Sequence, residues 1–143
     1  MERKMTIAQM EAFLLSDFPQ IDNQFTVVSS EPDKLVVRLN VREAHLRPGG
    51  TISGPSMFSL VDVGMYLAVL ERIGPVALAV TTNCSIDFMS KPEAGKDLIC
   101  ETRILKLGRY LAVGDVLVFS EGRDEPVARA SLTYSIPLRD GVN

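Results

Sequence analysis

Residues 54–71 read GPSMFSLVDVGMYLAVLE, and Asp62 is the only charged residue before the final glutamate. Pro55 suits the first turn of a helix because its missing N–H needs no partner there, so Ser53 or Gly54 is the expected N-cap. The positions that follow are apolar on nearly every side, which is typical of a helix buried all round. The segment therefore predicts a central helix that the rest of the chain must enclose.

The segments on either side of this helix have the β-branched composition of strands. Residues 25–30 and 35–41 flank the turn sequence Glu31-Pro32-Asp33-Lys34 and so predict a hairpin. After the helix, four more strands are expected, the last three joined by short turns as an antiparallel meander. Their expected ranges are 76–89, 97–107, 110–119 and 127–137.

The order of these elements indicates one α+β domain, residues 1–143. An N-terminal helical segment, residues 1–20, contains a short amphipathic helix at 6–16 that Thr6 can cap. We expect a curved antiparallel sheet of about six strands wrapped around the central buried helix. One small sheet cannot fully cover such a helix, and its edge strands must be paired or blocked. Both points favour a homodimer in which two sheets join edge to edge.

Composition disfavours several classes of protein. The chain has 143 residues, a net charge of −3 and a pI near 5.2, whereas general nucleic-acid binders are usually basic. No segment approaches the roughly 20 uncharged apolar residues of a membrane span, and the N-terminus lacks the apolar run of a signal peptide, so we expect a cytoplasmic protein with no membrane partner. With two cysteines and one histidine, His45, we expect no metal site.

Asp62 has a structural and a functional interpretation. An unpaired buried carboxylate costs several kcal/mol, so it needs hydrogen-bonding partners or access to water. In the structural interpretation, a neighbouring backbone or hydroxyl group satisfies it. In the functional interpretation, it faces an active-site cleft as a general base or nucleophile. The residues alone leave both interpretations open.

The start of the same helix is a second candidate feature. Backbone N–H groups in the first turn have no intrahelical acceptor and carry the positive end of the helix dipole. Gly54 would let a ligand approach such an N–H without a Cβ clash, so a carbonyl could be polarised there. Gly54 and Asp62 are eight residues apart. That is ~12 Å along a helix, too far to act on one carbonyl within a chain. An antiparallel helix pair in a dimer would bring them together.

Several motifs around the helix form a pattern that covers residues 25–137. They are His45-Leu46-Arg47-Pro48-Gly49-Gly50-Thr51-Ile52-Ser53-Gly54-Pro55, then Leu60-Val61-Asp62, Thr81-Thr82-Asn83, Phe88-Met89-Ser90-Lys91-Pro92 and Leu107-Gly108-Arg109. The pattern resembles the hotdog-fold acyl-CoA thioesterases of the phenylacetate-degradation (PaaI-like) type. The resemblance implies a hotdog fold and hydrolysis of an acyl-CoA thioester to a carboxylic acid and coenzyme A, with no metal or redox cofactor. It also implies assembly as a homodimer or a dimer-of-dimers homotetramer.

The resemblance assigns candidate catalytic residues as well. Asp62 matches the family's catalytic carboxylate, a general base or nucleophile, and the Gly54 N–H matches the oxyanion donor to the thioester carbonyl. Thr81 matches a hydroxyl that helps to hold the water in some members. Arg47 and Ser53 stand where the family often has Asn and His. Both are catalytic candidates because of their positions in the pattern, and at both the residue type differs from that of the family.

Substrate contacts follow from the same resemblance. The acyl tail would lie along apolar residues of the central helix and its partner, namely Met57, Phe58 and Val61. The family binds the coenzyme A nucleotide near the strand turns, where the candidate phosphate contacts are Lys91, Lys106 and Arg109. The alternation of residues 97–107 places Lys106 on the same face as Leu98.

Other functions remain open. The departures at Arg47 and Ser53 allow a non-catalytic acyl-CoA-binding hotdog module, which would bind thioesters without turnover. A structural or assembly domain, with the helix pair as its interface, would have no affinity for coenzyme A. A hotdog hydratase is disfavoured because those enzymes use an Asp-His pair elsewhere and this chain has only His45. A serine-hydrolase elbow is also disfavoured, since residues 54–58 lack the final Gly of G-x-S-x-G.

Overall fold

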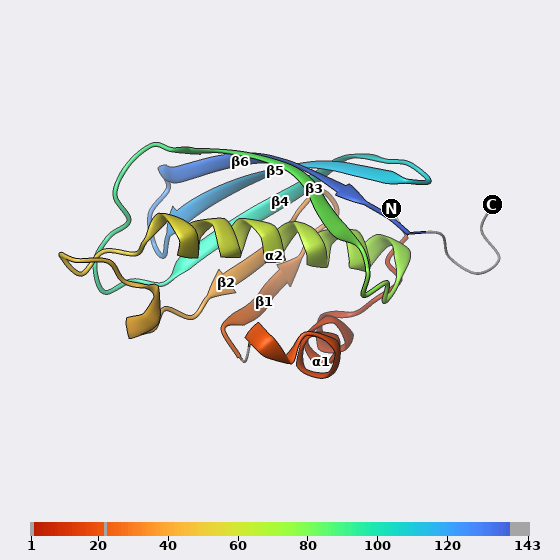
Figure 1. Cartoon of the computed structure of the whole chain (residues 1–143), viewed down its shortest axis with the longest axis horizontal. Helices are drawn as coiled ribbons and strands as arrows, with labels where there is room; N and C mark the ends of the chain where they lie inside the picture. Colours follow the sequence, from red (N-terminus) through yellow and green to blue (C-terminus); the bar gives the residue numbers. More distant parts are fainter. Residues whose placement is uncertain (1, 22, 138–143) are drawn as a thin grey trace.

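The computed structural model describes residues 2–21 and 23–137 of the chain. Its elements are, in chain order, α1 (Ile7–Asp17), the 3₁₀ turn η1 (Pro19–Ile21), β1 (Phe25–Ser30), β2 (Leu35–Leu39), the 3₁₀ turn η2 (Glu43–His45), α2 (Gly54–Ile73), β3 (Val80–Phe88), β4 (Leu98–Leu107), β5 (Leu111–Ser120) and β6 (Pro126–Ser135). The long helix α2 lies along the concave side of one curved sheet (Figure 1). This arrangement confirms the predicted α+β hotdog fold.

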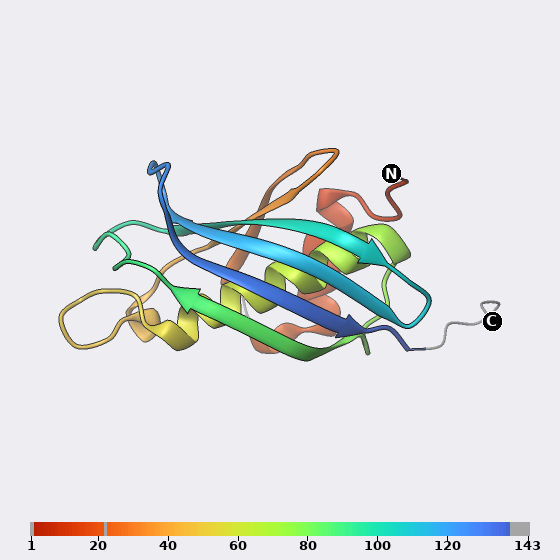
Figure 2. The same cartoon turned by 90° about the horizontal axis from the view of Figure 1, so that it is seen from above.

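All six strands belong to one antiparallel sheet with the order β1-β2-β4-β5-β6-β3. The hairpin β1–β2 joins the meander because β2 pairs with β4. β3 precedes the meander in sequence, but it pairs with β6, the last strand, and so forms the far edge. Seen from above, the strands cross α2 obliquely, and β3 lies at the outer edge of the sheet (Figure 2).

The two edges of the sheet are covered to different extents. α1 begins with a capping box between Thr6 and Gln9 and packs beside β1. From α1, Glu11 accepts the Val27 N–H at 3.1 Å and so occupies a donor of the β1 edge. No described element covers β3 in this way, and Val80 and Phe88 at its ends are exposed. An open edge of this length is a ready site for pairing with another chain.

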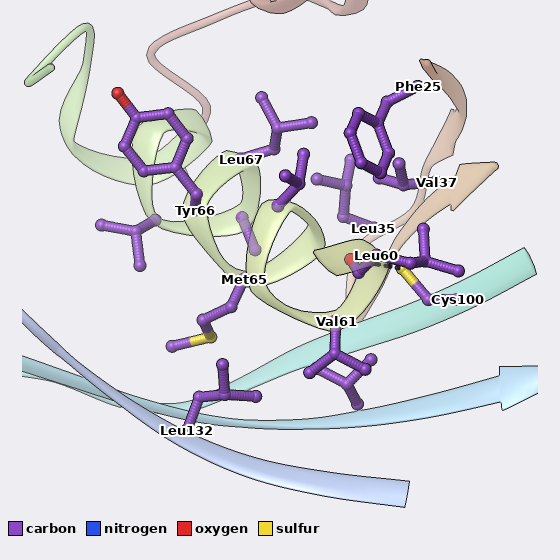
Figure 3. Packing of buried hydrophobic residues seen from close by; sticks show 14 of the residues in the cluster. Phe25, Leu35, Val37, Leu60, Val61, Met65, Tyr66, Leu67, Cys100 and Leu132 are labelled. Atoms are coloured by element: carbon purple, nitrogen blue, oxygen red, sulfur yellow. Dashed lines mark hydrogen bonds between the residues drawn. The ribbon is translucent and has the colours of Figure 1, made fainter. Parts of the chain in front are cut away.

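The core lies between α2 and the sheet. Val61 and Met65 point from α2 toward the strands, where Leu132 of β6 meets them (Figure 3), and all three side chains are buried. Gly64 permits a close approach between α2 and β4, since a Cβ atom at Gly64 would lie 2.7 Å from Cys100 Sγ. Burying each large apolar side chain stabilises the fold by about 1.5–3 kcal/mol, so this contact is a main source of stability.

Two boundaries around α2 differ from the sequence prediction. α2 continues past residue 71 to Ile73 and ends at Gly74, whose φ of +96° favours glycine. Residues 76–79, which were expected to begin the next strand, form a turn instead, with the Ala79 N–H donating to Val76 O at 3.2 Å. β3 therefore starts at Val80.

A β-bulge changes the face on which Lys106 lies. The pairing of β4 with β5 shifts register between Ile104 and Lys106, so that Lys106 opposes Val113. The next residue along β5, Gly114, faces Met65 of α2, which places Val113 and Lys106 on the outer face. The prediction that Lys106 shares the inner face of β4 is therefore wrong. Alternation assumes a period of two throughout and cannot reveal an extra residue.

Candidate active site

The N-terminal end of α2 presents one free backbone N–H. Ser53 is the N-cap: its Oγ accepts the Ser56 N–H at 3.3 Å, and its carbonyl accepts the Met57 N–H at 3.1 Å. Pro55 has no N–H to offer. In this first turn, Gly54 alone has an N–H without an acceptor among the described residues. That N–H lies at the positive end of the helix dipole and can donate to a carbonyl or an anion.

Phe88 borders this N–H. A Cβ atom on Gly54 would lie 3.5 Å from Phe88 Cζ, which is ordinary van der Waals contact. Phe88 ends β3 and keeps 52% of its surface exposed. The ring therefore forms one wall beside the start of α2 and leaves the other side open.

The loop before α2 is closed at its base and open at its tip. Leu46 and Ile52 form an isolated antiparallel bridge. Gly49 and Gly50 turn the tip with φ angles of +99° and +82°, which favour glycine. The Arg47 side chain is exposed and makes no hydrogen bond or ion pair with the described residues. The loop extends past the N-terminal end of α2 (Figure 1).

Two hydroxyl groups hold the carboxylate of Asp62. Thr81 Oγ1 and Tyr134 Oη both donate to Asp62 Oδ1, the second at 2.8 Å. Tyr134 Oη also lies 3.0 Å from the main-chain oxygen of Asp62. No hydrogen bond from a described residue reaches Asp62 Oδ2. One carboxylate oxygen is thus fixed and the other is open, so the two interpretations of Asp62 are compatible.

Tyr134 is a site residue that sequence reasoning missed. The sequence predicts an ordinary strand around it. In the structure its side chain lies on the inner face of β6, as that of Leu132 does. Tyr134 is 2% exposed, and burial together with the charge of Asp62 raises the pKa of its hydroxyl, which therefore remains a donor. One signal could have found it: a tyrosine at an inward position usually needs a partner for its hydroxyl.

Gly54, Phe58 and Asp62 follow one another at four-residue intervals and share one face of α2. This face adjoins β3 at both ends, because Gly54 contacts Phe88 and Asp62 contacts Thr81. Phe58, between them, is 39% exposed. We call this surface, made of Gly54, Phe58 and Asp62, the open face of α2.

The other two expected acyl contacts lie elsewhere. Met57 is 5% exposed and Val61 is fully buried. Figure 3 shows Val61 directed at the sheet. Of the three residues expected to contact the acyl tail, Phe58 alone has a surface open to a ligand in the described chain.

The candidate phosphate contacts lie at opposite ends of the sheet. Lys91 follows the C-terminal end of β3, whereas Lys106 and Arg109 lie at the β4–β5 hairpin at the other end (Figure 2). All three are exposed. The Arg109 guanidinium stacks 6.0 Å from the ring centroid of Tyr110. Strands of this length span about 30 Å, so one protomer does not bring the two groups to one phosphate cluster.

His45 holds the base of the loop. Its Nδ1 accepts the Arg42 N–H at 2.8 Å, so Nε2 carries the proton and donates to Gln24 Oε1 at 3.0 Å. The carbonyl of His45 accepts the Ser53 N–H and the Ser56 hydroxyl. Burial, followed by the charge of Arg42, lowers the pKa of the ring. His45 thus joins the loop to the helix start.

The cysteines and acidic residues offer no metal site within residues 2–21 and 23–137, where no cluster of three His, Cys, Asp or Glu is suitably placed. Cys84 and Cys100 are free thiols. Burial raises the pKa of both, that of Cys100 to about 12. In the same residues, neither helix combines the length and apolarity needed to cross a membrane.

A depression of about 480 Å³ lies on the outer face of the sheet and is separate from the open face of α2. Its charged lining residues are Asp87, Arg103, Asp115 and Arg129. Arg129 pairs with Asp87 at 2.9 Å, and Asp115 accepts a hydrogen bond from Ser131. These contacts satisfy much of the charge of the depression within the sheet itself.

Comparison with known proteins indicates the family of this chain. Residues 49–127 match the family model described as the thioesterase superfamily. Acyl-coenzyme A thioesterase 13 of Mus musculus is 31% identical over 106 residues, covering 73% of this chain and 74% of that protein. A solved structure of a provisionally assigned thioesterase from Silicibacter sp. TM1040 superposes with a TM-score of 0.90 at 55% identity, covering 96% of each chain.

A second solved structure connects the chain to the PaaI type. An N33D mutant of the phenylacetic acid degradation protein PaaI from Thermus thermophilus gives a TM-score of 0.70 at 29% identity. The match covers 83% of this chain and 99% of that one. The family model spans the open face of α2 and β3, the strand that adjoins it. The chain therefore belongs to the thioesterase superfamily, as a hotdog-fold thioester hydrolase of PaaI-like type.

Proposed function

We propose that the protein hydrolyses acyl-CoA thioesters at the open face of α2. The observation that carries this proposal is the carboxylate of Asp62, which has one oxygen fixed by hydroxyl donors and the other open. The similarity to acyl-coenzyme A thioesterase 13 supports the same substrate class.

In the proposed reaction, the thioester carbonyl oxygen accepts the Gly54 N–H, which stabilises the negative charge that develops on it. Asp62 acts in one of two ways. As a general base it takes a proton from a water that attacks the carbonyl carbon; as a nucleophile it attacks that carbon itself, and water then cleaves the resulting anhydride. The C–S bond breaks in either case. The carboxylic acid and coenzyme A, with its sulfur protonated, are the products.

We further propose that each site is shared by two subunits. Within one chain, Gly54 lies at the Phe88 end of β3 and Asp62 at the Thr81 end. β3 is the uncovered edge of the sheet, and antiparallel pairing of two β3 strands about their middle joins the Phe88 end of one to the Thr81 end of the other. The Gly54 N–H of one subunit then faces Asp62 of the partner subunit.

The same pairing gathers the substrate contacts. The Lys91 end of one subunit meets the end of the partner subunit that carries Lys106 and Arg109, so one coenzyme A can reach cations from both chains. The acyl tail follows Phe58 between the two helices. Arg47, at the exposed loop beside the start of α2, lies on the approach to the carbonyl.

The test is a panel of acyl-CoA thioesters assayed by free-thiol release. Asp62→Asn keeps the size of the side chain and removes its charge, so it should fold and lose about 10²-fold or more in turnover. Asp124→Asn, the same change in an exposed turn, is the matched control and should keep the wild-type rate. Near-wild-type turnover by folded Asp62→Asn would contradict the mechanism. Binding of thioesters by the wild type without thiol release would identify a binding module.

A further inference from the structure

We propose that Tyr134 is a positioning residue for Asp62: its hydroxyl, with that of Thr81, holds Oδ1 and thereby presents Oδ2 as the reactive oxygen. This inference rests on the proposed function, because it assigns a role to a neighbour of the proposed catalytic carboxylate. Tyr134 itself touches neither the substrate nor the reacting atoms.

The sheet places the two hydroxyls side by side. Thr81 on β3 and Tyr134 on β6 are direct cross-strand partners, so both side chains lie on the same face. That face is the inner one, below the α2 turn that carries Asp62. The contact between Asp62 and β6 is therefore set by strand pairing and not by loop conformation.

The hydroxyl of Tyr134 restrains the side chain of Asp62 against its own backbone. It lies 2.8 Å from Asp62 Oδ1 and 3.0 Å from the Asp62 main-chain oxygen. A donor that lies within hydrogen-bond distance of both Oδ1 and the main-chain oxygen of Asp62 favours a single rotamer of its side chain. With Thr81 on the same Oδ1, the carboxylate plane is defined and Oδ2 stays without a donor from the described residues.

Among the described residues, the side chains that hydrogen-bond to the carboxylate of Asp62 are the hydroxyl donors Thr81 and Tyr134. The charge of Asp62 acts on two neighbouring titratable groups, Tyr134 of β6 and Cys84 of β3. Burial raises the pKa of both, so both are neutral around pH 7. No Lys or Arg among the described residues forms an ion pair with Asp62. Removal of a hydroxyl should therefore act directly on the ionised form, which hydrogen bonds favour.

Tyr134→Phe tests the inference because it removes the hydroxyl and keeps the buried ring. We expect kcat to fall about 10-fold or more with little change in KM, since a hydrogen bond to a charged group is lost. We also expect the acidic limb of the kcat/KM profile to move to higher pH, because the ionised carboxylate loses a hydrogen bond. Thr81→Val should move the limb in the same direction. It serves as a second variant if Tyr134→Phe fails to fold.

Tyr66→Phe is the matched control. Tyr66 is also buried, and its ring centroid lies 6.2 Å from that of Tyr134, but its hydroxyl donates to Ala77 O at 3.0 Å. This variant loses the same atom from the same aromatic cluster and should keep the wild-type kcat and acidic limb.

The outcomes separate the inference from the proposed function. A purely structural role for Tyr134 predicts a lower melting temperature with the acidic limb in place, and that result would overturn the inference. The inference also fails if folded Tyr134→Phe keeps the wild-type kcat while Asp62→Asn is inactive. If Asp62→Asn remains active, the proposed function fails instead, whatever Tyr134→Phe does.

Discussion

The ring of Phe88 lies 3.5 Å from where a Cβ atom on Gly54 would stand, so the end of the edge strand meets the start of α2 beside the Gly54 N–H, which has no acceptor among the described residues. Because Phe88 packs at this position, Gly54 has two possible roles. The residue could matter because it lacks a side chain or because it offers a donor. Two substitutions at the same position distinguish these roles.

Gly54→Pro removes the N–H and fits the first position of a helix, and the preceding Ser53 has the extended conformation that proline requires. Gly54→Ala keeps the N–H and adds a Cβ that the structure accommodates. We expect both variants to fold, and Gly54→Pro to lose about 10²-fold more in kcat than Gly54→Ala. Thiol-release kinetics with melting curves provide the measurement. Equal losses would assign the effect to the side chain rather than to the donor.

Mixing two inactive variants tests the shared site. An Asp62→Asn chain still offers the Gly54 N–H, and a Gly54→Pro chain still offers Asp62, so a heterodimer contains one intact site. Random exchange between equal amounts of the two should restore about a quarter of the wild-type activity. Mass spectrometry would confirm the exchange. If heterodimers form and no activity returns, each site lies within one chain.

Arg47→Ala tests the exposed loop. If Arg47 polarises the carbonyl or binds coenzyme A, kcat/KM should fall by about 10-fold while the acidic limb stays in place. If Arg47 instead pairs with Asp62 of the partner subunit, its removal should move the acidic limb to higher pH and leave the activity at high pH intact. A variant unchanged in both respects would show that Arg47 is a solvated loop charge.

His45 should make stability depend on pH. Its lowered pKa means that the unfolded chain binds a proton more readily than the folded protein. Stability from the neutral ring is present above pH ~6.5 and is lost as the pH falls below it, with a slope of up to about 1.4 kcal/mol per unit. Urea unfolding of the wild type and of His45→Asn between pH 7.5 and pH 5 would measure this contribution, because the variant lacks it. Parallel pH curves for the two proteins would contradict the prediction.

Gly64 should tolerate no side chain. A Cβ there would lie 2.7 Å from Cys100 Sγ, so Gly64→Ala should destabilise the fold by about 1–3 kcal/mol through overpacking. Cys100→Ala removes the nearest atom, and in a double-mutant cycle it should recover part of the loss. Additive losses in the cycle would show that Cys100 is not the obstacle.

The fold was largely predictable because its signals are local. These signals are the apolar run of α2 around Asp62, the proline at its start and the turn sequence of the hairpin. Each of them extends over a few residues. The bulge before Lys106 and the turn at 76–79 were missed because apolar residues continue into both.

The site was predictable only in part. Asp62 stood out as a lone charge, and Gly54 stood out at a helix start. Tyr134 did not, because its role depends on the pairing of β3 with β6, which joins residues far apart in the sequence. Burial of Val61 and Met57 likewise depends on which side of α2 faces the sheet.

The closed base of the 46–52 loop has a consequence for how this protein can diverge. The Leu46–Ile52 bridge and the His45 carbonyl hold the chain just before the helix. Insertions or replacements at the tip should therefore leave the position of Gly54 unchanged. The sequence of the tip can therefore vary independently of the helix start. Substitutions in the tip can therefore change the groups beside the start of α2 while the Gly54 N–H keeps its position.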